Sequence, residues 1–113
     1  MRLAELNYVF CSDKYLLKIN QQYLKHNDYT DIITFPLSTP GSKEIRGEIY
    51  ISVDRVRENA RQYGISFRNE LHRVIFHGAL HLCGYKDKSQ KDKQAMTAAE
   101  NKCLSGFFSK TRQ

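Results

Sequence analysis

Hydrophobic and polar residues alternate in three short stretches of this chain, which is the pattern of β-strands with one face against a core. The alternation predicts strands over residues 5–11, 30–35 and 45–52. Pro36 is expected to end the second strand, because proline cannot donate a ladder hydrogen bond. Gly47 lies inside the third strand and indicates either a β-bulge or the close approach of another segment.

Four other stretches show the helical period and predict helices over residues 13–24, 53–63, 67–83 and 90–108. A serine, which is a favourable N-cap, precedes each of them: Ser12, Ser52, Ser66 and Ser89. Asp92, three residues after Ser89, completes a capping box. Gly64 and Gly84 are expected to stop the second and third helices in the left-handed conformation.

All four helices have an apolar face that is expected to pack on the rest of the protein. In the first helix the face consists of Leu16, Ile19 and Tyr23, with Leu17 and Leu24 beside it. In the second helix the face consists of Val53, Val56, Ala60 and Tyr63. In the third it consists of Leu71, Val74, Ile75, Gly78, Ala79 and Leu82. In the last it consists of Ala95, Met96, Ala98, Ala99, Cys103 and Phe107.

This order of elements predicts a single α+β domain over residues 1–113, in which helices cover a small sheet that is mixed or mostly antiparallel. The 41% hydrophobic content, with seven Tyr and six Phe, favours a folded globule over disorder. No apolar run approaches the roughly 18 residues of a transmembrane helix. Cys11, Cys83 and Cys103 form no C-x-x-C pair and no even framework, so we expect a protein of the reducing cytoplasm.

The chain carries 18 basic and 12 acidic residues, a formal charge of +6, which favours a polyanionic partner such as RNA. The candidates for phosphate contact include Lys25, Arg46, Arg55, Lys86 and Lys88, with Arg57 and Arg61. Any single one of them is more often an ordinary surface charge, and that alternative stays open.

His77 and His81 are four residues apart in the third predicted helix, so their imidazoles leave the same face one turn apart. This spacing suits a single metal ion, as in the helix of the zincins. Beyond Gly84 the chain can turn back and bring Asp87 in as a third ligand. Two histidines and a carboxylate leave one tetrahedral position for water, which is the pattern of a catalytic zinc site. The same spacing also fits a polar helix face that binds no metal.

The group that would exchange protons in such a site is not evident from the sequence. Gly78 stands where zincin proteases have the glutamate of H-E-x-x-H, which argues against peptide hydrolysis. Glu48 and Glu70 are candidates for acid or base groups, or for groups that orient a ligand; a solvated charge at the helix start is the alternative for Glu70. Cys83 is expected to point away from His81 and not to bind the metal.

Residues 77–85, which read HGALHLCGY, resemble the signature of the YbeY family of bacterial zinc-dependent endoribonucleases, implicated in rRNA maturation. Two upstream stretches strengthen the resemblance. Residues 20–23 and 30–36, NQQY and TDIITFP, are similar to the family's N-x-x-Y…T-[DN]-V-L-S-F-P, and residues 47–52, GEIYIS, are similar to its G-D-I-x-I-S. Together they span most of the chain in the family's order.

The resemblance implies an endoribonuclease that cuts single-stranded RNA in rRNA maturation and ribosome quality control. It implies one Zn²⁺ per chain, with His77, His81 and Asp87 as the catalytic metal ligands. The expected partners are rRNA and ribosomal particles, and the expected state is a monomer or weak oligomer. A zinc-containing module that binds RNA or ribosomes without cutting is the alternative, and a metalloprotease is a further one.

The chain departs from the family pattern in three places. Asp87 stands where the family usually has a third histidine, and a harder oxygen donor also admits other divalent metals. Leu24 follows the tyrosine of N-x-x-Y, where the family commonly has arginine; the neighbouring Lys25 supplies charge but no bidentate fork. The first strand begins almost at Met1, whereas family members usually have a preceding segment, so we expect a short or trimmed N-terminus and an uncovered sheet edge.

Overall fold

The computed structural model of the chain describes residues 2–39 and 41–111, with the backbone alone at residues 2–4 and 108–111. Its elements are β1 (Arg2–Cys11), α1 (Asp13–Tyr23), β2 (Ile32–Pro36), β3 (Glu44–Ser52), α2 (Val53–Tyr63), α3 (Phe67–Leu82) and α4 (Gln90–Thr111). All seven predicted elements are present in the predicted order. β2 begins later than predicted and includes Pro36, which an edge strand tolerates at its end.

β3 is the central strand of a three-stranded sheet with the order β1-β3-β2. It pairs with β1 in parallel and with β2 in antiparallel fashion, so the predicted mixed sheet of an α+β fold is confirmed. The register of the β1–β3 ladder shifts between Leu3 and Glu5 and runs evenly past Gly47. Of the two interpretations of Gly47, the bulge is therefore wrong.

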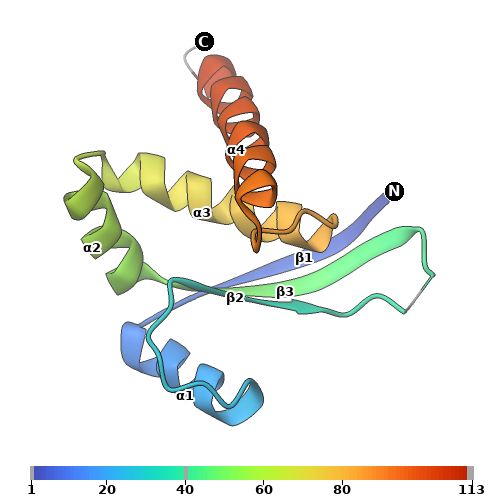
Figure 1. Ribbon diagram of the computed structural model, residues 1–113, viewed down its shortest axis with the longest axis vertical. Helices are drawn as coiled ribbons and strands as arrows, with labels where there is room; N and C mark the ends of the chain where they lie inside the picture. Colours follow the sequence, from blue (N-terminus) through green and yellow to red (C-terminus); the bar gives the residue numbers. More distant parts are fainter. Residues whose placement is uncertain (1, 40, 112–113) are drawn as a thin grey trace.

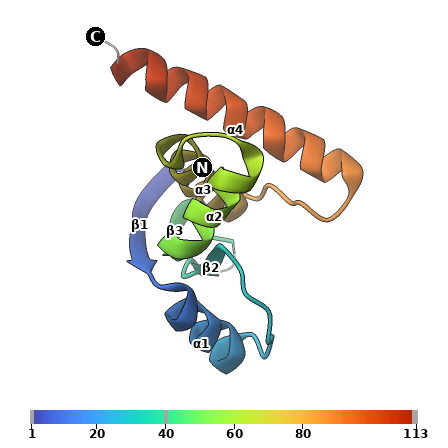
Figure 2. The same ribbon diagram turned by 90° about the vertical axis from the view of Figure 1, so that its left-hand side faces the viewer.

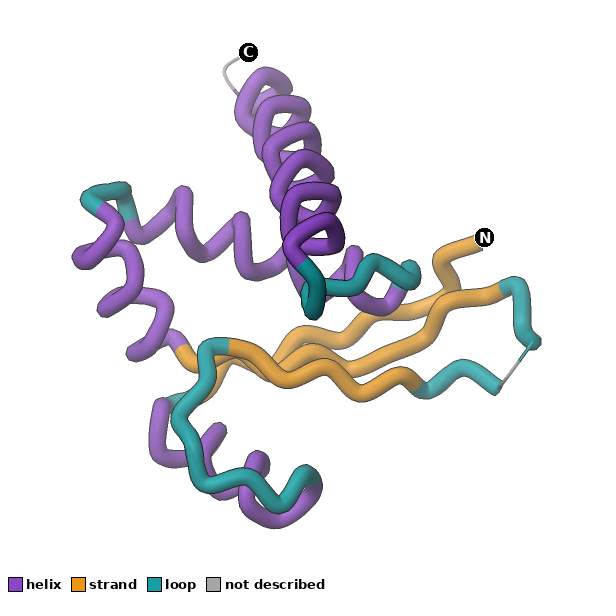
Figure 3. The backbone as a smooth tube through the Cα atoms, in the orientation of Figure 1, coloured by secondary structure: helices purple, strands orange, loops and turns teal. Residues whose placement is uncertain are grey.

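Helices cover both faces of this sheet (Figure 1). α3 lies along one face and α1 packs against the other, while α4 lies over α3 on the side away from the sheet (Figure 2). The backbone tube shows the same layers, with α2 linking the end of β3 to the start of α3 (Figure 3). Within the described residues, no helix is both long and apolar enough to cross a membrane.

The core is divided by the sheet into two clusters. On the side of α3 the buried residues are Ile49, Ile51, Val56 and Val74. On the side of α1 they are Leu16, Ile19 and Ile33. Successive residues of β3 point to opposite faces, so Ile49 and Ile51 face α3 while Tyr50 packs with the α1 cluster.

The predicted N-caps are confirmed. The hydroxyl oxygens of Ser12, Ser52 and Ser66 each accept the backbone N–H three residues ahead, at 3.0–3.1 Å. The Asp92 N–H donates to Ser89 Oγ at 3.0 Å, and the Ser89 N–H donates to Asp92 Oδ2 at 3.3 Å, which is the reciprocal capping box. Gly64 and Gly84 both have a positive φ, 69° and 106°, which an L side chain would strain.

Three predicted inner faces need correction. In α1, Leu16 and Ile19 are buried, but Tyr23 at the end of the helix is 66% exposed. Tyr63 is 64% exposed, because α2 ends there and the chain turns at the next residue. In α4, Ala95 and Ala98 are exposed. The buried residues of α4 include Met96 and Leu104, which are eight residues and about two turns apart on one face.

Two glycines allow α3 to lie directly on the sheet. A Cβ atom at Gly78 would come within 2.8 Å of Ile32 Cδ1 and 2.9 Å of Ile49 Cγ2. A Cβ at Gly47 would come within 2.6 Å of Leu82 Cδ1. Gly78 of α3 and Gly47 of β3 therefore lie at the points of closest approach between the helix and the sheet. The absence of a side chain at both positions sets the short distance between α3 and β3.

We expect the substitution Gly78→Ala to lower the free energy of unfolding by about 1 kcal/mol. Alanine favours the helix by about 1 kcal/mol over glycine, but overpacking against Ile32 and Ile49 costs about 1–3 kcal/mol. Gly106→Ala is the matched control, because a Cβ at Gly106 in α4 meets nothing within 4 Å, and it should stabilise by about 0.5–1 kcal/mol. Urea unfolding measures both. A Gly78→Ala protein stabilised as much as Gly106→Ala would contradict the close packing.

Candidate metal centre

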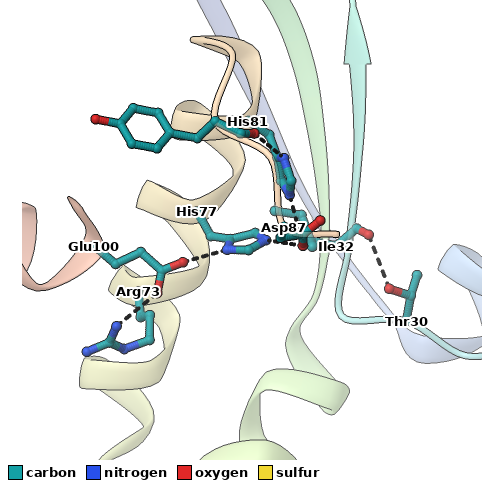
Figure 4. A network of polar contacts seen from close by, with 8 residues as sticks. Thr30, Ile32, Arg73, His77, His81, Asp87 and Glu100 are labelled. Carbon is teal, nitrogen blue, oxygen red and sulfur yellow. Dashed lines mark hydrogen bonds and ion pairs between the residues drawn. The ribbon is translucent and has the colours of Figure 1, made fainter. Parts of the chain in front are cut away.

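α3 presents His77 and His81 on one face, with ring centroids 4.5 Å apart. The helix ends at Leu82, and the turn through Gly84 brings the chain back toward the two rings. Asp87 Oδ2 lies 3.6 Å from His77 Nε2 and 3.3 Å from His81 Nε2 (Figure 4). The predicted trio thus comes together on one side of the helix.

In each ring the nitrogen that faces away from Asp87, Nδ1, has a hydrogen-bond acceptor beside it. His81 Nδ1 lies 3.0 Å from the backbone oxygen of Tyr85, and His77 Nδ1 lies 2.5 Å from Glu100 Oε2. A carbonyl oxygen and a carboxylate only accept, so both Nδ1 atoms carry the proton. In the neutral rings the lone pair is then on Nε2, which is the atom of each ring that faces Asp87.

Glu100 is bound from two sides. Its Oε1 accepts a hydrogen bond from Arg73 at 2.8 Å, while its Oε2 contacts His77, as Figure 4 shows. Burial alone would raise the pKa of Glu100, but the hydrogen bonds from His77 and Arg73 outweigh it and hold that pKa below its ordinary value. The hydrogen bond to Glu100 raises the pKa of His77 against the opposing effect of burial.

The three side chains have the geometry of a metal-ligand group. One ligand atom from each of His77, His81 and Asp87 lies within 4.8 Å of the others. Two imidazole nitrogens and one carboxylate oxygen are ligands that zinc accepts in catalytic sites. Outer hydrogen bonds from ligating histidines to a carboxylate and a backbone carbonyl are typical of metal sites, because they fix the ring orientation. The residues present therefore fit a divalent metal.

Comparison with protein families decides the relationship of this chain. The family model described as "Endoribonuclease YbeY" matches residues 1–107. The chain belongs to the YbeY family. Members of this family with high similarity include the endoribonuclease YbeY of Flavobacterium psychrophilum, 53% identical over 95% of this chain and 75% of that protein. Those of Cytophaga hutchinsonii and Bacteroides thetaiotaomicron are 53% and 50% identical over 91% of this chain and 71% and 74% of theirs.

A solved structure has the same fold. The solution structure of a Thermotoga maritima protein superposes with a TM-score of 0.69 and 32% identity, over 95% of this chain and 70% of the other. The α+β architecture described above is therefore shared with an experimentally determined protein.

Glu100 contacts the candidate metal centre through His77, although no feature above predicted it. It lies between Met96 and Leu104 on the buried face of α4, four residues from each. A signal was present, since a charged residue at the centre of an apolar helical face requires a partner. The partner could not be named without the fold, because His77 is 23 residues away along the chain.

Two interpretations of acidic residues are corrected by the structure. Glu70 is not a solvated charge at the helix start: it is only 4% exposed, because it faces inward from the first turn of α3. Burial, followed by the charge of Asp31, raises the pKa of Glu70. Glu48 lines a groove on the α1 side of the sheet with Tyr15 and Tyr23, opposite the histidine helix, so its assignment as an acid or base group is wrong.

The structure does not gather the predicted RNA-contacting residues into one patch. Lys86 and Lys88 are exposed on either side of Asp87, next to the metal-ligand group. Arg55 is engaged by Asp13 at 2.7 Å, and Arg46 forms an exposed ion pair with Glu44 at 3.4 Å. Lys25 lies beyond α1, with a positive φ of 56°. Phosphate contact by these residues stays a prediction.

We expect Glu100→Gln to lower the free energy of unfolding of the metal-free protein by about 1–3 kcal/mol at neutral pH. The substitution keeps the shape of the side chain but removes the charge that both His77 and Arg73 contact. Urea unfolding in the presence of a chelator measures it. The matched control is Glu58→Gln, whose carboxylate forms an exposed ion pair with Arg61, and it should change stability by less than about 0.5 kcal/mol. Equal effects of the two substitutions would refute a structural role for the charge of Glu100.

Proposed function

We propose that this protein is a Zn²⁺-dependent endoribonuclease that cuts single-stranded RNA, with one Zn²⁺ per chain held by His77, His81 and Asp87. The observation that carries the proposal is the convergence of three ligand atoms within 4.8 Å in a chain of the YbeY family. The relatives of this family are named endoribonucleases, and an endoribonuclease hydrolyses the phosphodiester bonds of RNA.

The protein's own groups prepare the site. Glu100 and the carbonyl of Tyr85 hold the protons on the outer ring nitrogens, so both Nε2 lone pairs face Asp87. Zn²⁺ held by His77, His81 and Asp87 would supply a water whose pKa is lowered to about 7, and positive charge that favours reaction at a phosphate. The exposure of Lys86 and Lys88 on either side of Asp87 supports a role for them in attracting the phosphates of the strand.

The biological assignment follows from the family resemblance in the sequence. We propose that the substrate is rRNA within ribosomal particles, cut during rRNA maturation and ribosome quality control in the cytoplasm. We also propose that residues 1–113 act as one domain and as a monomer or weak oligomer. The formal charge of +6 favours association with such a polyanionic partner.

Asp87 takes the place of the third histidine of the family pattern, and its role can be tested by metal affinity. We expect Asp87→Ala to weaken Zn²⁺ binding by about 100-fold or more, since even groups that only support a ligand contribute about 10–100-fold. Asp87→His should keep Zn²⁺ binding, because imidazole is also a zinc ligand. Competition with a chromophoric chelator measures the Zn²⁺ affinity of both variants. The matched control is Asp28→Ala, which removes an exposed aspartate from a loop. Undiminished affinity in Asp87→Ala would remove Asp87 from the ligand set.

The nuclease activity can be tested on an unstructured RNA oligonucleotide. Protein freed of contaminating nuclease should cut it, a chelator should stop the reaction, and His77→Ala should lower kcat/KM by about a thousandfold or more. His26→Ala, which alters an exposed loop histidine, should leave kcat/KM unchanged. Tight RNA binding without cleavage by the wild-type protein would instead support the alternative, a zinc-containing module that binds RNA without cutting it.

A further inference from the structure

A cleft of about 360 Å³ lies beside the metal-ligand group and shares His77 with it. Its lining comes from the segment before β2, the end of α2 with the loop that follows it, and α3 and α4. The residues that matter for its chemistry are Asp31, Tyr63, Ile65, Glu70, Val74 and His77. The proposed function makes no use of this space.

Glu70 is the unusual member of this lining. It is 4% exposed, and its Oε1 atom is buried without a hydrogen-bond partner among the described residues. A buried carboxyl oxygen without a partner costs free energy, and most buried polar atoms in proteins are paired. Glu70 is also one of the residues that line the cleft, so a ligand bound there with an N–H donor would have this carboxylate as an acceptor.

The other charged side chains that line the cleft are either paired with each other or acidic like Glu70. Arg73 contacts Glu100, and the second oxygen of Glu100 contacts His77. Asp31 adds another carboxyl, and burial raises the pKa of that group. The cleft therefore offers acceptors and negative charge on a partly apolar surface formed by residues such as Val74 and Ile65.

This chemistry selects among possible ligands. A phosphate group is disfavoured, because the carboxyls of Asp31 and Glu70 would repel it. A second divalent metal is disfavoured too. Among the described residues, the group of His, Cys, Asp and Glu close enough to hold an ion is His77, His81 and Asp87, and it includes neither Asp31 nor Glu70.

A nucleobase meets the requirements that remain. It is flat, its faces are apolar enough for Val74 and Ile65, and its edge carries N–H donors. Tyr63 lines the same cleft and is 64% exposed, so an aromatic ring is available for stacking. A volume of about 360 Å³ is at the small end of ligand pockets and suits one base rather than a folded RNA element.

We propose that this cleft binds one nucleobase of the RNA strand, with the carboxylate of Glu70 accepting N–H donors from the edge of the base. Guanine fits best, because its N1–H and N2–H₂ donors are adjacent and can approach one carboxylate together. The inference rests on the proposed function for the identity of the strand. Because His77 belongs to both the cleft and the metal-ligand group, the bound base lies next to the scissile phosphate and gives the protein a base preference.

The test is binding of short oligonucleotides to the zinc-loaded protein by fluorescence anisotropy. The probes are 2′-O-methyl uridine hexamers with one guanosine, inosine, adenosine or cytidine at the centre, confirmed on a gel to remain uncut. The wild-type protein should bind the guanosine probe about tenfold more tightly than the all-uridine probe, and inosine, which lacks the N2 amino group, should lose most of that gain. Glu70→Gln should abolish the preference for guanosine and bind the all-uridine probe as the wild type does.

Two controls exclude a purely structural effect of the substitution. Glu58→Gln removes a charge from the neighbouring helix α2 at a residue with an exposed ion pair, and it should keep the guanosine preference. The thermal midpoint of Glu70→Gln should be equal to or above that of the wild type, because the substitution removes a buried charge without a partner. A lower midpoint, with all probes weakened equally, would mean that Glu70 supports the fold and would overturn the proposal.

The outcomes separate this inference from the proposed function. Equal affinity of the wild-type protein for all probes overturns the base-binding cleft even if the protein cuts RNA. A guanosine preference that is lost in Glu70→Gln supports the cleft even if no cleavage is found. Binding of Mn²⁺ at a second site, detected by electron paramagnetic resonance in the wild type and absent in Glu70→Gln, would assign the cleft to a cation and overturn it.

Discussion

The hydrogen bond between His77 and Glu100 is the contact on which the arrangement of the site depends. It joins α3 to α4, two helices that meet through residues 23 positions apart. It decides which nitrogen of His77 keeps its proton, and therefore which nitrogen faces Asp87. Arg73 binds the other oxygen of Glu100, so the carboxylate stays charged although it is largely buried. Without this contact the buried carboxylate of Glu100 in α4 would lose one of its two partners, and the ring of His77 would lose its fixed orientation.

The position of α3 on the sheet is the second constraint. Gly78 lies between the two histidines in sequence and presses against Ile32 and Ile49, so the helix rests on β2 and β3 at the level of the site. A functional group is placed most accurately when it is carried by a rigid element packed on the core. Asp87 is the exception, since it lies on the turn after α3, and the carbonyl of Tyr85 in that turn also holds the ring of His81. The turn therefore contributes both a ligand atom and a support for another ligand.

Acidic side chains gather along the inner side of α3 at a cost in stability. Glu70 and Asp31 have a raised pKa because they are buried, and Glu70 Oε1 has no partner among the described residues. Proteins usually avoid such groups, and they are concentrated at sites where a ligand or a reaction uses them. Glu70 and Asp31 line the cleft that adjoins the candidate metal centre, and His77 belongs to both.

The order and type of the elements, their caps and the pairing of His77 with His81 were all predictable from the sequence, because these features depend on residues close together in the chain. Serine N-caps, the helical period and a spacing of four residues act within one or two turns. The signature at residues 77–85 is also a contiguous stretch, so the family resemblance could be seen in the sequence, and the family model confirms it. The return of Asp87 was predicted as a possibility of the turn, and the structure brings its carboxylate close to both rings.

Other features were decided by tertiary structure alone. The choice of Glu100 as the partner of His77, the burial of Glu70 and the position of Glu48 across the sheet all depend on how distant segments pack. Helical spacing showed that Met96 and its neighbours face inward, but it could not exclude Ala95 and Ala98, because alanine is compatible with either environment. The local sequence determined which elements form and where they end. Contacts between elements decided which charges are buried, since burial is a property of the assembled fold.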